Sequence, residues 1–220
     1  KYVYKKINLP IKQIDKKENW RRIIDFKNNS GWIHWSQLKK VNSVGFKNFD
    51  FDGYVVATPA ETHFLIAKQI IESGKHLLVE KPLTTNLKDA EELYDLASEK
   101  NIVLLTDHTF LYNTSINYIN ELIENKDIGE LLHISFERTN LGPIRSDVSS
   151  LWDLATHDIS IMNAFIKDEI TESSASGYIK GDSELHDIVN VSINFPSKFV
   201  SIFASWLHPE KSRKIKIRRY

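Results

Sequence analysis

Three short apolar runs alternate with two helical patterns between residues 54 and 107, and this alternation constrains the fold more than any other feature of the chain. The runs YVV, HLLV and IVLL are continuously apolar, as strands are when both faces of a parallel sheet are covered. The two segments between them space their apolar residues along one helix face, with Gly74 predicted to end the first helix and Thr85 or Asn86 to cap the second. The order predicts part of a Rossmann-like, doubly wound α/β domain.

The pattern changes after Asp107. Two further helices are predicted, in SINYINELIENKDIG and in WDLATHDISIMNAFI, and the remaining segments alternate polar and apolar residues with period two. This predicts an α+β domain with an open, mainly antiparallel sheet, and we place the boundary near residue 110, which gives domains 1–110 and 111–220. In the first 50 residues, KENWRRIIDF has the spacing of a helix face, and a short strand-like piece lies between Trp32 and Trp35.

Composition excludes several classes of protein. Twenty-nine Lys and Arg balance 29 Asp and Glu, so no overall field gathers nucleic acid or an anionic membrane. The chain has no cysteine and no H-x-H or H-E-x-x-H arrangement, which argues against thiol chemistry and a metal site. No apolar run is long enough for a membrane span. We therefore expect a cytoplasmic protein without a nucleic-acid or membrane partner.

Polar residues follow two of the predicted parallel strands. Thr58 and Pro59 end the first strand, and Glu80, Lys81 and Pro82 end the second. Ligands of open α/β sheets bind beyond the carboxyl ends of the strands, so both sets are expected on one rim. An X-Pro bond is cis at low cost, and Pro82 is expected to make a sharp turn that directs Lys81 over the crevice. The alternative is that Lys81 is only the first solvated residue after a strand.

A second candidate site lies in WDLATHD. Asp153 and His157 are four residues apart, so on a helix they share a face, where the carboxylate would orient the imidazole. Such a pair suits a general base near neutral pH. A surface pair or a bridge between helices is the alternative. Asp158 points to a different face and is expected to act as a cap or a bridge between domains.

Four blocks in succession carry a resemblance to a known family. VVATPAETH, VEKPL, TDHTFLYN and WDLATHDISI resemble the Gfo/Idh/MocA family of nicotinamide-dependent oxidoreductases over about residues 50 to 210. The stretch NLGPIRSDVSSLWDLATHD further resembles members associated with nucleotide-sugar and surface-polysaccharide biosynthesis. The resemblance implies an NAD(P)-dependent sugar oxidoreductase with NAD or NADP as cofactor, in which residues 1–110 bind the dinucleotide and residues 111–220 bind the substrate and form a dimer or tetramer.

The resemblance also implies roles for individual residues. The E-K-P lysine beside the nicotinamide and the reacting hydroxyl falls on Lys81, and the D-x-x-x-H pair falls on Asp153 and His157. The residues expected to line the cofactor are Thr58, Pro59, His63, Glu80, Lys81 and Pro82, whereas Ala60 stands where many members have Asn. Arg138, Asn140 and Arg145 are candidates to bind a diphosphate or a carboxylate of the substrate, with a solvated edge as the alternative.

One departure from the family concerns its glycine-rich loop. The family binds pyrophosphate with a G-x-G-x-x-G turn, and this chain contains no G-x-G. Since it also starts with Lys1 and has Met162 as its only methionine, we expect a fragment that binds dinucleotide poorly. The alternative function is a catalytically inactive sugar-binding or oligomerisation fragment. The choice between NAD and NADP, the sugar and the carbon oxidised stay open.

Overall fold

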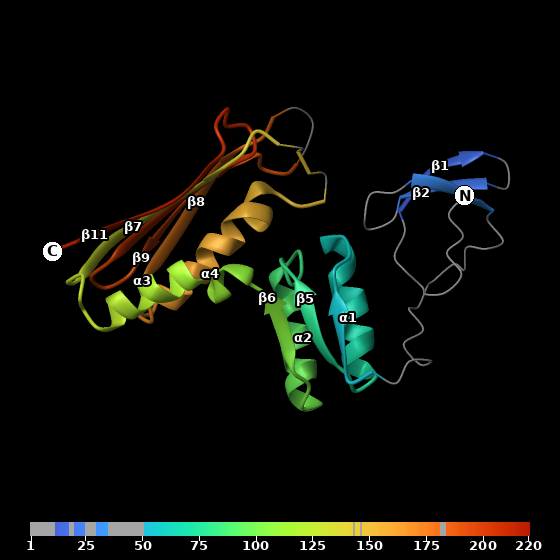
Figure 1. The fold of residues 1–220 in the computed structure, drawn as a ribbon, viewed down its shortest axis with the longest axis horizontal. Helices are drawn as coiled ribbons and strands as arrows, with labels where there is room; N and C mark the ends of the chain where they lie inside the picture. The colour runs from blue at the N-terminus through green and yellow to red at the C-terminus, as the bar shows by residue number, and fades with distance from the viewer. Residues whose placement is uncertain are drawn as a thin grey trace. The chain divides into compact units, whose positions relative to one another are not determined.

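The structure is a computed structural model that describes residues 51–220 apart from residues 143, 146 and 181–183, and the backbone of three strands before them (Figure 1). These strands, β1 (Lys12–Lys17), β2 (Trp20–Ile24) and β3 (Ser30–His34), pair antiparallel in that order. The helix face predicted in KENWRRIIDF is therefore wrong, because strand pairing overrides a helical spacing in so short a segment. The strand-like piece near Trp32 is confirmed. The chain divides into two units between Asp52 and Gly53.

The predicted alternation of strands and helices forms a parallel sheet. Strands β4 (Gly53–Val56), β5 (His76–Glu80) and β6 (Leu104–Asp107) lie side by side in this order. Helix α1 (His63–Glu72) follows the 3-10 turn η3 (Ala60–Thr62), packs on β4 and β5, and contacts α2 (Leu87–Glu99). The buried side chains that join these layers are Val56, Ala67, Ile70, Ile71, Leu77, Val79 and Leu93.

The predicted ends of both helices are found. Gly74 has φ of 75°, in the left-handed region that glycine adopts without strain after a helix. Asn86 accepts a hydrogen bond from the backbone N–H of Asp89 at 2.9 Å and so caps α2. With the helices bounded by these residues, the chain returns each time to the same side of the sheet. Because β4, β5 and β6 are parallel, their carboxyl ends lie at one edge.

The second half of the chain forms a five-stranded sheet. Its strands are β7 (Leu131–Thr139), β8 (Glu172–Tyr178), β9 (Ile188–Asn194), β10 (Phe199–Ser205) and β11 (Ser212–Arg219), in the order β11-β7-β10-β9-β8. Only β7 and β10 pair in parallel, so the predicted open, mainly antiparallel sheet is confirmed. Helices α3 (Thr114–Glu124) and α4 (Thr156–Phe165) cover one face (Figure 1). No described helix covers the other.

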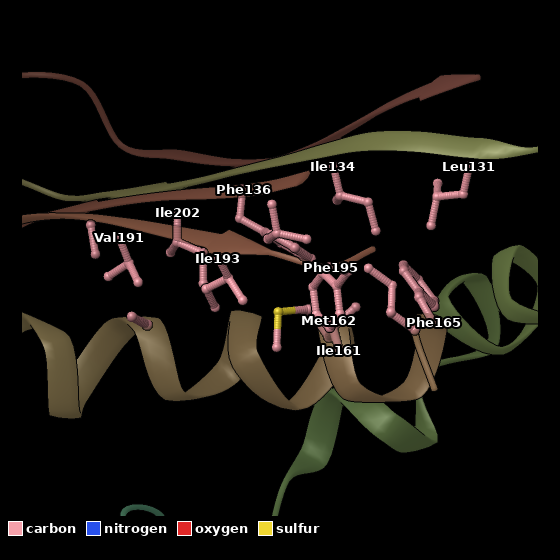
Figure 2. Close-up of a cluster of buried hydrophobic side chains, with 14 of the residues drawn as sticks. Leu131, Ile134, Phe136, Ile161, Met162, Phe165, Val191, Ile193, Phe195 and Ile202 are labelled. Carbon is pink, nitrogen blue, oxygen red and sulfur yellow. The ribbon is translucent and has the colours of Figure 1, made fainter. Parts of the chain in front are cut away.

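The main hydrophobic core lies between this sheet and α4. Figure 2 shows Ile134 and Phe136 of β7 and Ile202 of β10 pointing toward Ile161 and Met162 of α4, and all five side chains are at most 1% exposed. Burying a side chain of this size stabilises a fold by about 1.5–3 kcal/mol. This layer therefore fixes α4, and the turn that precedes it, on the sheet.

The segment WDLATHD departs from a regular helix. Residues Leu151–Ala155 form a π-helical turn, η5, which continues directly into α4. The apolar spacing predicts a single helix, because one wider turn leaves that spacing nearly unchanged. Such turns are often found at functional sites. None of the helices that the structure describes is long and apolar enough to pass through a membrane.

Candidate active site

Lys81 connects the parallel sheet to the turn before α4. It follows β5, and the Lys81–Pro82 peptide bond is cis, as the sequence predicts. The Lys81 ammonium donates hydrogen bonds to the backbone carbonyl of Asp153 at 2.6 Å and to its Oδ1 at 2.9 Å. The side chains of Lys81 and Asp153 are only 15% and 16% exposed. Lys81 therefore lies over the π-helical turn and is not a freely solvated residue after a strand.

Asp153 is the centre of a hydrogen-bonded cluster. Its Oδ1 also accepts from the Nη1 of Arg145 at 3.2 Å, and its Oδ2 accepts from the indole Nε1–H of Trp206 at 3.2 Å. Burial raises the pKa of Asp153, but the hydrogen bond and charge of Lys81, together with Arg145 and Trp206, outweigh burial and hold the pKa below its usual value. Asp153 is thus a carboxylate at neutral pH.

His157 lies one turn further along, at the start of α4. Its ring packs edge-on against Phe110, with ring centroids 5.0 Å apart. Burial, followed by the positive charges of Lys81 and Arg138, lowers its pKa to about 3. At neutral pH the imidazole is therefore neutral, and without a bound substrate it is a weaker base than a free imidazole.

The hydrogen bond expected between Asp153 and His157 is not found among the described residues. The carboxylate oxygens bind Lys81, Arg145 and Trp206, and the Nδ1 of His157 is buried without a hydrogen-bond partner in the described part of the chain. Asp153 therefore orients the lysine of the cluster. The i, i+4 spacing predicts that Asp153 and His157 share a helix face. It contains no information about Lys81 and Arg145, which bind the Asp153 carboxylate in place of the imidazole.

His108 lies close enough to Lys81 and His157 to interact with them through charge, and the sequence motifs did not predict it as a site residue. It follows β6 directly, at the edge of the sheet where Pro59 and Lys81 also lie. Burial is the main cause that lowers its pKa, and the charge of Lys81 lowers it further. Its Nδ1 is buried and has no partner among the described residues. The signal that could have found it is the same as for Lys81, a polar residue after a buried parallel strand.

His63 joins two of the strand ends. It is 1% exposed, and its Nε2 and Nδ1 contact the carbonyl oxygens of Thr58 at 2.8 Å and Pro82 at 2.7 Å. The Thr62 hydroxyl donates to the Thr58 hydroxyl at 2.7 Å on the same rim. His63 therefore holds the β4 and β5 loops together. Its expected contact with a cofactor stays a prediction, as do those of Thr58, Pro59 and Pro82.

The three residues predicted to bind substrate have partners inside the protein. Arg138 is 6% exposed and binds Asp158 with two nitrogens, Nε at 3.1 Å from both carboxylate oxygens and Nη2 at 2.6 Å from Oδ1. Arg145 binds Asp147 at 2.6 and 2.9 Å as well as Asp153. The backbone N–H of Asn140 donates to the carbonyl oxygen of Ser205 at 3.0 Å, and contact of its side chain with a substrate stays a prediction. Arg138 is thus not on a solvated edge, and Asp158 is its buried partner.

The residues predicted to line the cofactor share one edge of the parallel sheet. Glu80, Lys81 and Pro82 follow or end β5, and Thr58 and Pro59 follow β4, at the carboxyl edge where ligands of open α/β sheets bind. Their contact with a nicotinamide stays a prediction. The sequence offers no G-x-G loop for the pyrophosphate. In the described part of the chain, no group of three His, Asp or Glu residues could hold a metal ion.

Comparison with known proteins assigns both halves of the chain. Residues 16–108 match the family model described as an oxidoreductase family with an NAD-binding Rossmann fold, and residues 116–218 match the GFO/IDH/MocA C-terminal domain. The predicted cofactor, NAD or NADP, agrees with the first of these descriptions. The predicted resemblance is confirmed over nearly the whole chain.

Individual relatives include enzymes that act on nucleotide sugars. The UDP-N-acetylglucosamine 3-dehydrogenase of Acidithiobacillus ferrooxidans is 29% identical over 115 residues, which cover 51% of this chain and 35% of the relative. The dTDP-3,4-didehydro-2,6-dideoxy-alpha-D-glucose 3-reductase of Saccharopolyspora spinosa is 35% identical over 82 residues, 37% of this chain and 25% of the relative. The chain therefore aligns with about a third or less of these relatives.

Solved structures share the fold. GenD2 from gentamicin A biosynthesis, solved in complex with NAD, has a TM-score of 0.71 at 25% identity, and the match covers 80% of this chain and 54% of GenD2. The matches of both halves, in the same order along the chain, show that this protein belongs to the Gfo/Idh/MocA family of oxidoreductases.

Proposed function

We propose that the protein is an NAD(P)-dependent oxidoreductase that transfers a hydride between a nicotinamide and the carbon of a sugar hydroxyl, with a nucleotide sugar as substrate. One observation carries this proposal: the Lys81 ammonium and the neutral His157 imidazole flank a single turn, that of Asp153. The names of the nucleotide-sugar relatives support the substrate class.

The chemistry needs a base and a cation at one oxygen atom. His157 is neutral at neutral pH, so it can take the proton of the reacting hydroxyl when that carbon loses its hydride. A nicotinamide held at the carboxyl edge of the parallel sheet would supply the hydride-transfer chemistry in either direction. The Lys81 ammonium stabilises the negative charge that develops on the oxygen, a contribution of about 2.7–4 kcal/mol for one well-placed donor.

Asp153 positions Lys81 for this role. An ammonium carries three N–H donors, and two of the Lys81 bonds go to the carbonyl and the Oδ1 of Asp153. One donor is left for a substrate oxygen. Because Trp206 and Arg145 hold the carboxylate in turn, the direction of the ammonium is fixed before substrate arrives, which favours catalysis.

Nicotinamide absorbance tests the proposal. We expect turnover when a form of the protein that also carries a glycine-rich dinucleotide loop is mixed with NAD or NADP and a panel of UDP- and dTDP-sugars, and loss of most of it in Lys81→Met and in His157→Gln. Lys100→Met is the matched control, because this substitution removes the same charge from an exposed residue at the end of α2, away from the site. Full turnover in the Lys81 or His157 variant would contradict the assigned roles.

A second candidate function is sugar binding or oligomerisation without turnover. The residues given contain no G-x-G, the loop whose backbone amides normally hold the pyrophosphate, so these residues by themselves are expected to bind dinucleotide poorly. Titration calorimetry distinguishes the two candidates: binding of a nucleotide sugar without any binding of NADH or NADPH would support this second one.

We also keep as proposals a cytoplasmic location, a domain boundary near residue 110, and a homo-oligomer formed through the five-stranded sheet. The boundary is supported by the two family models, of which the first ends at residue 108 and the second begins at residue 116. The homo-oligomer is supported by the sheet face that no described helix covers.

A further inference from the structure

A cavity of about 170 Å³ lies beneath the edge strand β11, on the side of the sheet that α3 and α4 cover. An apolar cavity of about 150 Å³ holds a molecule as large as benzene, so this space can take a phosphate or carboxylate group together with part of the molecule that carries it. Its lining combines apolar and charged side chains: Phe110, Asn113, Ile116, Arg138, Asp158, Ile161, Arg213, Lys214 and Ile215.

Two arginines face this cavity with one carboxylate between them. Arg213 of β11 pairs directly with Arg138 of β7, so both side chains lie on the helix-covered face, where Ile215 also lies against Phe136. Like charges directly opposite each other on neighbouring strands destabilise a sheet. Asp158 binds Arg138 with both oxygens, and it is the only acidic residue among the described residues that line the cavity.

Arg213 shares its counter-charge with Arg138. Its exposed guanidinium forms no ion pair in the described part of the chain and interacts with Asp158 through charge alone, whereas Lys214, whose side chain points to the opposite face, lies 3.7 Å from Glu137. The two arginines and Asp158 thus leave a net positive charge at the cavity. An anion that entered would complete the neutralisation that Asp158 begins.

The side chain of Asn113 also offers a donor to the cavity. Asn113 caps α3, and its Oδ1 accepts from the backbone N–H groups of Ser115 at 2.9 Å and Ile116 at 3.3 Å. Because these contacts fix the oxygen, the Nδ2 of the amide is left to donate elsewhere. The cavity is thus lined by cations and hydrogen-bond donors, and the Asn113 and Asp158 side-chain oxygens already accept hydrogen bonds within the protein. Such a lining selects an anion.

We propose that this cavity binds the anionic phosphate group of a ligand, with Arg213 as the residue that holds it. Phe110 lies between the cavity and the active site: its ring is 5.0 Å from the His157 ring and 4.7 Å from the Arg138 guanidinium. A sugar at His157 could therefore place a phosphate group in the cavity. The anion site stands on the cavity alone, and its assignment to the substrate rests on the proposed function.

Calorimetric titration with inorganic phosphate, UDP and uridine tests the site in the absence of nicotinamide and of sugar. We expect phosphate and UDP to bind and uridine to fail. Tighter binding of UDP than of phosphate would identify a nucleotide as the source of the anion, whereas equal binding would identify a site for free phosphate. Since no cofactor is present, an enzyme without hydride transfer would still give this result.

Two variants of β11 decide whether Arg213 is responsible. Arg213→Gln is expected to weaken phosphate and UDP binding by about tenfold or more, because it removes a charge-assisted hydrogen bond, and Arg213→Lys should retain part of the binding. Lys216→Gln is the matched control: the residue is exposed on the same strand and points to the opposite face. Both side chains are exposed, so the variants should fold, which circular dichroism checks. Unchanged binding in Arg213→Gln, absence of binding in the wild type, or equal binding of uridine would overturn the proposal.

Discussion

Replacing Arg138 by methionine should destabilise the five-stranded domain strongly. The substitution keeps an apolar side chain of similar length, but it removes every hydrogen bond that Asp158 receives from the arginine. Asp158 is 2% exposed and cannot turn to water. Breaking a buried ion pair by removing one partner costs about 3–5 kcal/mol, so we expect the free energy of unfolding to fall by about that amount.

A double substitution tests whether the cost comes from the abandoned carboxylate. In Arg138→Met/Asp158→Leu no buried charge is left, and replacing a buried pair by apolar residues is often neutral or stabilising. We therefore expect the double variant to recover most of the stability. The interaction energy from the resulting double-mutant cycle measures the coupling of the two side chains.

Urea denaturation followed by circular dichroism provides the assay. Lys214→Met is the matched control, because Lys214 pairs with Glu137 across the same two strands but is 57% exposed. Exposed pairs contribute about 0–1 kcal/mol, so this control should change little. A loss in Arg138→Met no larger than that of the control, or a double variant less stable than the single one, would show that the abandoned carboxylate is not the source of the cost.

Three further changes have defined outcomes. Lys81→Met should raise the pKa of His157, measured by NMR titration, because the Lys81 charge is one cause that lowers it. An unchanged pKa would show that the Lys81 charge does not act on His157. His157→Gln should flatten the fall in unfolding free energy as the pH drops from about 6.5 to about 3, since over this range the unfolded chain binds a proton that the folded one does not; an unaltered slope on urea denaturation would contradict this. Gly129→Ala should cost more than Gly74→Ala: both glycines have positive φ, but a Cβ at Gly129 would lie 2.7 Å from a backbone carbonyl oxygen and one at Gly74 meets nothing within 4 Å. Equal losses of melting temperature would argue against that contact.

The sequence predicts the elements of the site better than their pairings. Lys81 is found where a polar residue after a parallel strand should be, since strand order and rim follow from the alternation of strands and helices. The partner of its ammonium, Asp153, depends on how the turn before α4 approaches β5, and residue spacing contains no information about that approach.

The features of the site that the sequence did not predict have the same physical origin, because they depend on how distant segments pack. Arg138 and Asp158 are 20 residues apart, and only the packing of α4 on β7 brings them together. Trp206 follows a buried strand and is indistinguishable in sequence from a core residue, although its indole N–H binds the carboxylate of Asp153. The π-helical turn is hidden because apolar spacing barely changes over one turn.

Transfer of deuterium shows whether the protein moves a hydride from a sugar carbon to a nicotinamide. UDP-N-acetylglucosamine deuterated at every ring carbon, and other UDP- and dTDP-sugars labelled in the same way, would be incubated with the protein and oxidised nicotinamide, and the reduced nicotinamide would be analysed by mass spectrometry. We expect one deuterium in the reduced nicotinamide with at least one of these sugars, and its loss when His157 is replaced by Gln. Reduced nicotinamide without deuterium, or none with any of the sugars although the protein binds both ligands, would contradict this expectation.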